Sequence, residues 1–132
     1  MSISLVEWDD WGVAGTHHSK QPNPSWEQVE HLILSLDGSS HTLVKLAFDE
    51  DAYMIVAGGS DGNYIVFATL GDGTFSQVTN ASNSDELVLL DIGGQPGEYP
   101  KKHCVSLTTA CEAVKAYYEN GHLMPGLTWE VA

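Results

Sequence analysis

Short turns rich in glycine and aspartate divide residues 42–90 into a series of apolar runs. The turns fall at residues 49–51, 58–62 and 71–73, and each joins one run to the next with only a few residues. Parallel strands need a crossover of about a dozen residues or more, so connections this short permit only antiparallel pairing. The spacing therefore predicts an antiparallel meander through the middle of the chain.

Two segments with the apolar spacing of a helix flank this meander. The first begins after Ser25, which with Gln28 forms the pattern of a capping box, and extends to about residue 37. The second runs from about Leu107 to Asn120 and is stopped by Gly121. This order predicts an α+β fold, with one antiparallel sheet of about four to six strands and the N-terminal and C-terminal helices packed on it.

Two segments are predicted to lack regular structure. Residues 12–23 are polar and contain glycine and histidine, which is typical of a loop. Residues 93–100 combine three glycines with two prolines, and because both residue types interrupt helices and sheets we expect a shaped loop there. Short strands are expected near residues 3–8, at an edge, and near 127–131. The length predicts a single domain over residues 1–132.

The charge balance is the most unusual part of the composition. The chain has 18 acidic residues against five lysines and no arginine, which gives a formal net charge of −13. Such a surface repels phosphate groups and anionic lipids, so we expect neither direct nucleic-acid binding nor membrane binding. It favours association with a basic partner. The alternative is that the acidity only keeps the protein in solution.

Targeting and metal-binding patterns are absent from the sequence. Residues 1–11 mix apolar and acidic side chains without a basic start, which argues against a secretory leader and predicts a cytoplasmic protein. Cys104 and Cys111 fit neither a zinc site nor a disulfide framework. We therefore expect two free thiols, no metal and no cofactor.

A search for catalytic motifs favours a protein that is not an enzyme. The glycine-rich turn at residues 58–62 fits no phosphate-binding or dinucleotide-binding pattern, because no helix follows it. Two alternatives stay open. In one, His103, Tyr99 and a carboxylate such as Glu98 converge in the pocket of an enzyme or small-molecule-binding module. In the other, the chain is an acidic subunit of a larger assembly.

Acidic turns and one tryptophan are the candidate partner-binding residues. The strand phase near the N-terminus places Trp8 inside and leaves Trp11 as the surface aromatic, the residue type that often anchors protein interfaces. Turns at opposite ends of a sheet cannot all serve one patch, so we expect only a subset to face a partner. The candidates are Asp9, Asp10, Trp11, Asp49, Glu50, Asp51, Asp61 and Asp72.

Several motifs between residues 24 and 130 follow one another in a recognisable order. Pro24, Trp26 and Val29 open the first helix, and glycines at 58, 59 and 62 interrupt a strand pair. The Gly-Gly-Gln-Pro-Gly-Glu-Tyr-Pro segment at 93–100 precedes the second helix, and Leu-Thr-Trp-Glu at 127–130 closes the set. In order and spacing these motifs resemble the deaminase-associated immunity proteins of bacterial polymorphic toxin systems.

That resemblance implies a small, cytosolic, non-catalytic antidote. Its partner would be a cognate toxin, typically a nucleic-acid deaminase or nuclease domain, whose basic active-site surface it would block. The resemblance does not indicate which residues contact the toxin, because the surfaces of immunity proteins diverge together with their toxins.

Overall fold

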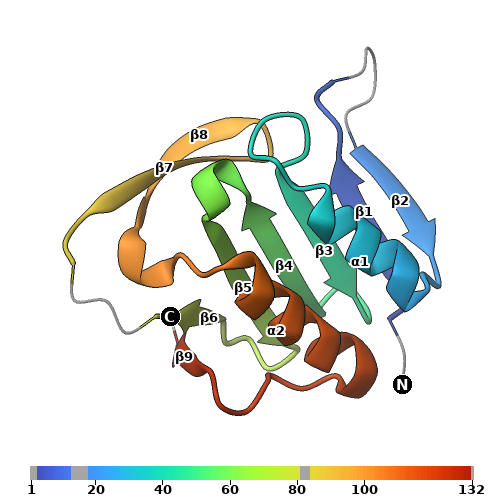
Figure 1. Ribbon diagram of the computed structural model, residues 1–132. Coiled ribbons are helices and arrows are strands. Elements are labelled where there is room, and N and C mark those ends of the chain that lie inside the picture. The colour runs from blue at the N-terminus through green and yellow to red at the C-terminus, as the bar shows by residue number, and fades with distance from the viewer. Residues whose placement is uncertain (1–2, 13–17, 81–83, 132) are drawn as a thin grey trace.

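The computed structural model describes residues 3–12, 18–80 and 84–131. Seven strands form an antiparallel sheet in the order β2-β1-β3-β4-β5-β6-β9, and β7 and β8 form a separate hairpin (Figure 1). The strands are β1 Leu5–Asp9, β2 His18–Pro22, β3 Leu43–Ala47, β4 Ala52–Gly58, β5 Tyr64–Leu70, β6 Ser76–Thr79, β7 Leu87–Ile92, β8 Gln95–Pro100 and β9 Thr128–Val131.

The prediction of one sheet with four to six strands is wrong, because the protein has a mostly-sheet fold with two sheets. One source of the error is β2, which occupies part of the segment predicted as a loop and moves β1 from the expected edge to an interior position. All five residues of β2 are exposed. An edge strand of this kind buries neither face, so it lacks the alternation of apolar and polar residues that reveals a strand.

The second source is β8, which lies in the segment 93–100 that was expected to be irregular. Gly93 and Gly94 form the two-residue turn between β7 and β8 with φ of 62° and 78°, the positive values that a type I′ hairpin turn requires. The two prolines of β8 pair with β7 residues at positions where their nitrogens point away from β7. A strand tolerates proline there, because no ladder hydrogen bond is lost.

Both helices begin as the sequence predicts. Helix α1, Trp26–Leu34, starts at Ser25 with both hydrogen bonds of the capping box, and α2, Leu107–Asn120, is followed by Gly121 with φ of 71°. Helix α1 ends three residues earlier than expected. The Asp37 carboxylate accepts the backbone N–H groups of Ser39 and His41 and so closes a tight turn. Among the described residues, no helix has the length and apolar character needed to cross a membrane.

The two faces of the main sheet are covered differently. Both helices lie on one face (Figure 1), where Val44, Met54 and Val66 pack with Ile33 and Val114 in the larger core. The β7–β8 hairpin covers part of the opposite face. A smaller cluster there is built on Ala57, Ile65, Leu90 and Cys104. The rest of this second face has no further layer of described structure over it.

Candidate partner-binding surface

The eight predicted residues lie at two opposite ends of the main sheet. Trp8 pairs with Val44 near the start of β3, so β1 ends beside the turn that leads into β3. Asp61 lies at the same end, between β4 and β5. The other end carries the β3–β4 and β5–β6 turns, which adjoin because Ala52 pairs with Leu70. We name them the Trp11 end (residues 10–12, 36–41, 59–63 and 91–95) and the Phe75 end (residues 48–51 and 71–75).

Asp9 is the only candidate that is fully buried. Its Oδ1 accepts the backbone N–H groups of Thr42 at 2.7 Å and Leu43 at 3.0 Å. Its Oδ2 accepts the indole Nε1–H of Trp11 at 2.7 Å and the hydroxyl of Thr42. A partner at the surface does not reach this carboxylate, which instead joins β1 to β3 and orients Trp11.

The same network ties the β7–β8 turn to Thr42 and Trp11. The Thr42 hydroxyl oxygen accepts the backbone N–H of Gly93 at 2.8 Å. Gly94 packs so closely on the Trp11 ring that a Cβ added to it would lie 2.5 Å from Cζ2. Trp11 nevertheless remains 36% exposed, with its ring edge-on to His18 at 6.3 Å between centroids. The exposed indole is therefore held between a buried carboxylate and a glycine turn.

The turns around Trp11 are acidic. Asp10 accepts the backbone N–H of Gly12 at 3.0 Å, and Asp61 is exposed in a left-handed conformation with φ of 52°. Burial raises the pKa of Asp37, but hydrogen bonds from the backbone N–H groups of its turn outweigh that effect and lower it overall. The four segments contain Asp10, Asp37, Asp61 and Asp91 and no lysine, and the chain has no arginine.

The Phe75 end carries the other four acids. Asp49 Oδ1 accepts the N–H groups of Asp51 at 2.8 Å and Ala52 at 2.9 Å. Hydrogen bonds from the side chain and the backbone of Thr74 lower the pKa of Asp72. Phe75 is 43% exposed and meets Tyr53 edge-on, with ring centroids 6.5 Å apart. This end therefore also joins acids to an exposed aromatic ring.

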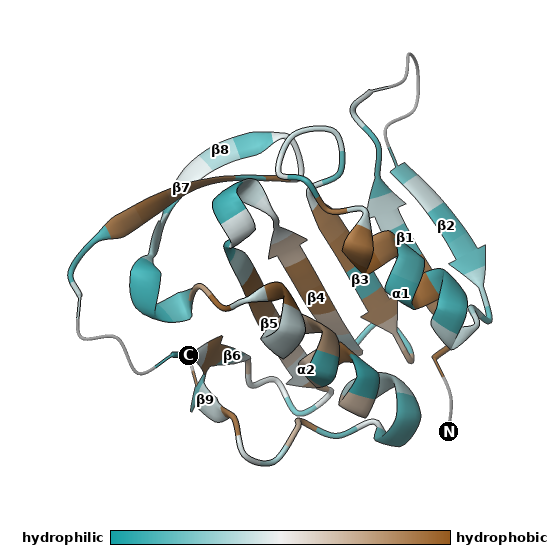
Figure 2. Ribbon diagram, in the orientation of Figure 1, coloured by the Kyte–Doolittle hydropathy of each residue, from teal (hydrophilic) through white to brown (hydrophobic). Residues whose placement is uncertain are grey.

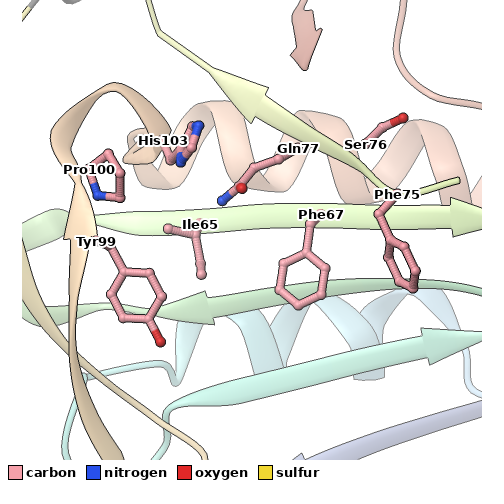
Figure 3. A pocket seen from close by; sticks show the side chains of 8 residues that line it. All are labelled: Ile65, Phe67, Phe75, Ser76, Gln77, Tyr99, Pro100 and His103. Carbon is pink, nitrogen blue, oxygen red and sulfur yellow. The ribbon is translucent and has the colours of Figure 1, made fainter. Parts of the chain in front are cut away.

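A shallow apolar cleft of about 340 Å³ lies on the sheet face opposite the helices (Figure 3). Tyr99 and His103 both line it, but the Tyr99 hydroxyl points away from the His103 ring (Figure 3). Glu98 precedes Tyr99 on β8, so its side chain lies on the other face of the hairpin. The carboxylate beside His103 is Glu130, whose Oε2 is 3.7 Å from Nε2. The three residues of the enzyme alternative therefore do not converge.

Comparison with known proteins identifies the family. A family model described as immunity protein Imm1 matches residues 6–131. The chain belongs to the Imm1 family. Membership indicates an immunity protein for a bacterial toxin, and the family implies a cognate toxin as partner and a non-enzymatic role. The match begins at residue 6, so it includes Trp11 and all of β1 except Leu5, a stretch that the sequence resemblance left out. A search of curated proteins finds no match.

No metal site is evident in the described parts of this Imm1 protein, where no three His, Cys, Asp or Glu side chains are grouped to hold an ion. Cys104 and Cys111 are free thiols. Burial raises the pKa of both thiols, and the nearby carboxylates of Glu30 and Glu112 raise that of Cys111 further. Both thiols are therefore poor nucleophiles at neutral pH.

Sequence reasoning missed two residues that shape the Trp11 end. Thr42 links Asp9 to Gly93, and Gly94 forms the surface on which the Trp11 ring rests. Thr42 lies 33 residues from Asp9 and no local pattern joins them. The glycine pair at 93–94 was interpreted as part of an irregular loop and of a family motif, and not as a hairpin turn. A pair of glycines is typical of a two-residue hairpin turn, and this pattern could have predicted the β7–β8 hairpin.

Proposed function

We propose that this Imm1 protein neutralises a toxin that modifies nucleic acid, a deaminase or nuclease domain, by covering its basic substrate surface with the Trp11 end. The observation that carries the proposal is a partly exposed indole, fixed by the buried Asp9 carboxylate, in the middle of acidic turns without lysine. Two requirements for blocking a phosphate-binding surface, negative charge and a rigid anchor, are met at one place.

The negative charge of this surface explains why we propose a toxin that acts on nucleic acid. An enzyme that acts on nucleic acid presents lysine and arginine to the phosphates of its substrate. Asp10, Asp37 and Asp61 would stand where those phosphates lie. A net charge of −13 would also speed the encounter with a basic toxin, since electrostatic steering raises association rates by ~10- to 1000-fold.

The properties of the Trp11 side chain explain why we place the toxin at the Trp11 end and not at the Phe75 end. Tryptophan is among the residues most enriched at interface hot spots, whereas phenylalanine is less so. The Trp11 ring is already held by a hydrogen bond and by Gly94, so binding would cost little side-chain entropy. Among the described residues, Phe75 meets one other aromatic ring, that of Tyr53, and no hydrogen bond fixes its side chain. We therefore assign the toxin-facing role to Asp10, Trp11 and Asp61, and not to Asp49, Glu50, Asp51 and Asp72.

The proposal is tested with a candidate toxin domain taken from the genes beside this one. The toxin is expressed with and without the Imm1 protein, and cell survival, complex formation and modification of DNA or RNA by the purified toxin are measured. We expect survival only with the Imm1 protein, a stable complex, and inhibition that excess nucleic acid relieves. Equal killing in both cultures, with no complex at micromolar concentration, would overturn it.

Paired variants then locate the surface. Asp10→Asn/Asp61→Asn and Glu50→Gln/Asp51→Asn each remove two charges while keeping side-chain shape, one pair at each end. At low salt we expect the first pair to slow association by about 3- to 10-fold and to flatten its salt dependence, because rim charges act mainly on the association rate. The second pair should change the rate much less. The reverse order would assign the toxin to the Phe75 end.

The cleft supports a second candidate function, the binding of a small apolar ligand. Its volume of about 340 Å³ and its lining by Ile65, Phe67 and Tyr99 suit such a ligand. Native mass spectrometry of protein purified from its own cells would reveal a retained ligand. Release of that ligand by Phe67→Ala, with toxin binding unchanged, would assign the cleft a separate role.

A further inference from the structure

We propose that strand β7 is an open edge to which an extended, basic segment of the cognate toxin adds as a further strand. The inference rests on the proposed function for its basic partner, and it adds a second place and a mode of binding. Partners that bind in this way gain backbone hydrogen bonds from the edge and specificity from alternate side chains.

The register of the hairpin shows which backbone groups point outward. The N–H of Lys101 donates to the carbonyl of Glu86 at 3.0 Å, so this pair is hydrogen-bonded. Bonded and non-bonded pairs alternate along an antiparallel ladder. Val88, Leu90 and Ile92 therefore bond to β8, while the N–H and C=O groups of Leu87 and Leu89 point away from it. β7 has β8 as its only partner strand among the described residues.

The other described edges carry features that discourage strand addition. The edge strand β2 has Lys20 and Pro22, and the β8 edge has Pro96 and Pro100, whose nitrogens carry no hydrogen. β9 carries Glu130, which lies 3.7 Å from the ammonium of Lys102. Lysine, proline and charge are the usual means by which proteins block their sheet edges. β7 contains neither lysine nor proline.

Two leucine side chains beside this open edge are exposed and give it an apolar surface. Leu87 is 56% and Leu89 68% exposed, and Leu89 is the most exposed large apolar residue among the described ones. Both lie on the outer face of the hairpin, since the intervening Val88 and the following Leu90 pack inward. Figure 2 shows β7 as a brown band beside the paler and teal β8. The outer face thus offers two apolar contacts at the alternate positions that an added strand would meet.

The acidic residues around β7 indicate which kind of strand binds at this edge. Asp85 and Glu86 precede the two leucines, Asp91 follows them, and Glu98 pairs with Leu89 across the hairpin. Lys101 lies near this edge and bridges to Glu86 at 3.3 Å, and the adjacent Lys102 bridges to Glu130 at 3.7 Å. A second copy of this chain would bring these acids against their equivalents, with a charge of −13 on each copy. A segment that alternates apolar residues with lysine or arginine fits both the leucines and the acids.

The hairpin turn connects this edge to the Trp11 end. Gly94 lies against the Trp11 ring, and Gly93 donates to Thr42, so the tip of the β7–β8 hairpin is part of the proposed toxin-facing surface. One toxin domain could therefore cover Trp11 and lay a strand along β7. Phe75, at the opposite end of the main sheet, meets the hairpin across the apolar cleft, which Tyr99 and Pro100 of β8 also line, and not through the hairpin turn.

Amide hydrogen exchange tests the edge directly. It is measured by NMR on the Imm1 protein alone and in complex with the cognate toxin domain made catalytically inactive. We expect the Leu87 and Leu89 amides to exchange at least ~10-fold more slowly in the complex. The Val88 amide, already bonded to β8, is the internal control and should change less. A complex in which Leu87 and Leu89 are unprotected would overturn the inference while leaving the proposed function standing.

Substitutions supply an independent test. Leu89→Pro removes an outward N–H without removing a bond to β8, and we expect at least ~10-fold weaker toxin binding. Glu98→Pro makes the same change on the β8 edge and should weaken binding less than about threefold. If Leu89→Pro unfolds the protein, Leu89→Lys replaces it, placing a like charge beside a basic strand. Unchanged affinity of the folded variant for the toxin would overturn the proposal that a toxin strand binds along β7.

The outcomes separate the two proposals. If no complex forms with the toxin domain, the proposed function fails and the edge assignment falls with it. If a complex forms through β7 with a toxin that does not act on nucleic acid, only the proposed target is wrong. A concentration-dependent dimer of the Imm1 protein that Leu89→Lys abolishes would assign the edge to a second copy and overturn the toxin segment as its occupant.

Discussion

The indole Nε1–H of Trp11 donates to Oδ2 of Asp9 at 2.7 Å, and that carboxylate has no exposed surface. A buried charge thus sets the direction of a partly exposed aromatic ring. Asp9 also receives the backbone N–H groups of Thr42 and Leu43, so the orientation of Trp11 is coupled to the β1–β3 contact. The stability of this end and its capacity to bind a partner should therefore depend on the same residue.

Asp9→Asn is the first test of this coupling. The substitution keeps the shape of the side chain but turns one acceptor oxygen into a donor that faces the Trp11 indole and the Thr42 hydroxyl. We expect the free energy of unfolding to fall by about 3 kcal/mol, since hydrogen bonds to a buried charge are lost. Urea unfolding measures it.

Asp10→Asn is the matched control for that variant. Asp10 is not buried, and an asparagine oxygen can still accept the N–H of Gly12, so we expect a smaller loss than for Asp9→Asn. Equal destabilisation by the two variants would show that the Asp9 carboxylate has no special structural role.

The contact between Trp11 and Gly94 gives a second prediction. Gly93 and Gly94 both have positive φ, so alanine at either position carries backbone strain of ~1 kcal/mol. Only Gly94→Ala also pushes into the Trp11 ring, since nothing lies within 4 Å of a Cβ at Gly93. We expect Gly94→Ala alone to shift the tryptophan fluorescence and to weaken toxin binding. Equal effects from both variants would mean that the ring contact has no consequence.

The sequence predicts those parts of the fold that local patterns determine. Ser25 with Gln28 identified the start of α1, and Gly121 the end of α2, because caps depend on residues close in sequence. The strands β2 and β8 were missed because neither shows an apolar alternation. β2 is exposed on both faces, and β8 contains prolines that its free edge accommodates.

The sequence predicted individual residues of the candidate surface but not how they are arranged. Asp10, Trp11 and Asp61 were named from acidic turns and an unburied tryptophan, and the sheet brings them to one end. The burial of Asp9 was not predictable, because it depends on Thr42 and Leu43 across a strand pair. The exposure of Leu87 and Leu89 was likewise not predictable from the sequence. A run of apolar residues predicts a buried strand, and only the separate hairpin leaves one of its faces open.

Removing the indole should act on toxin dissociation. We expect Trp11→Ala to weaken binding by ~2 kcal/mol or more, mainly through a faster off-rate, because buried anchors set the lifetime of a complex. Phe75→Ala is the control, since that ring is similarly exposed but lies at the other end of the sheet. Surface plasmon resonance separates the two rates. A larger loss with Phe75→Ala would move the interface to the Phe75 end.

Tyr117 gives a prediction for stability that is independent of any partner. Its side chain is fully buried, and among the described residues no group forms a hydrogen bond with its hydroxyl. Tyr117→Phe removes this hydroxyl and keeps the edge-on ring contact with Phe48, whose centroid is 5.2 Å away. We expect the free energy of unfolding at neutral pH to rise by ~1 kcal/mol, because a buried polar group without a hydrogen bond is costly.

Tyr118→Phe should change stability in the opposite direction. The Tyr118 hydroxyl donates to the carbonyl of Pro24 at 2.7 Å and so ties α2 to the start of α1. Its loss should lower the free energy of unfolding by about 1 kcal/mol. If both variants lose stability equally, the Tyr117 hydroxyl must have a partner in solution, such as a bound water.

The pH dependence of stability separates Tyr117 from its neighbours more sharply. Burial, together with the negative charge of Asp49, raises the pKa of Tyr117 to about 12, above the value of about 10 expected in the unfolded chain. The folded state therefore keeps this proton where the unfolded state has lost it. Stability from the neutral phenol is fully present below pH ~10 and is lost as pH rises toward the folded pKa. Denaturant midpoints measured between pH 8 and pH 11 should fall less steeply for Tyr117→Phe than for the wild type, and parallel curves would show that Tyr117 does not drive alkaline unfolding.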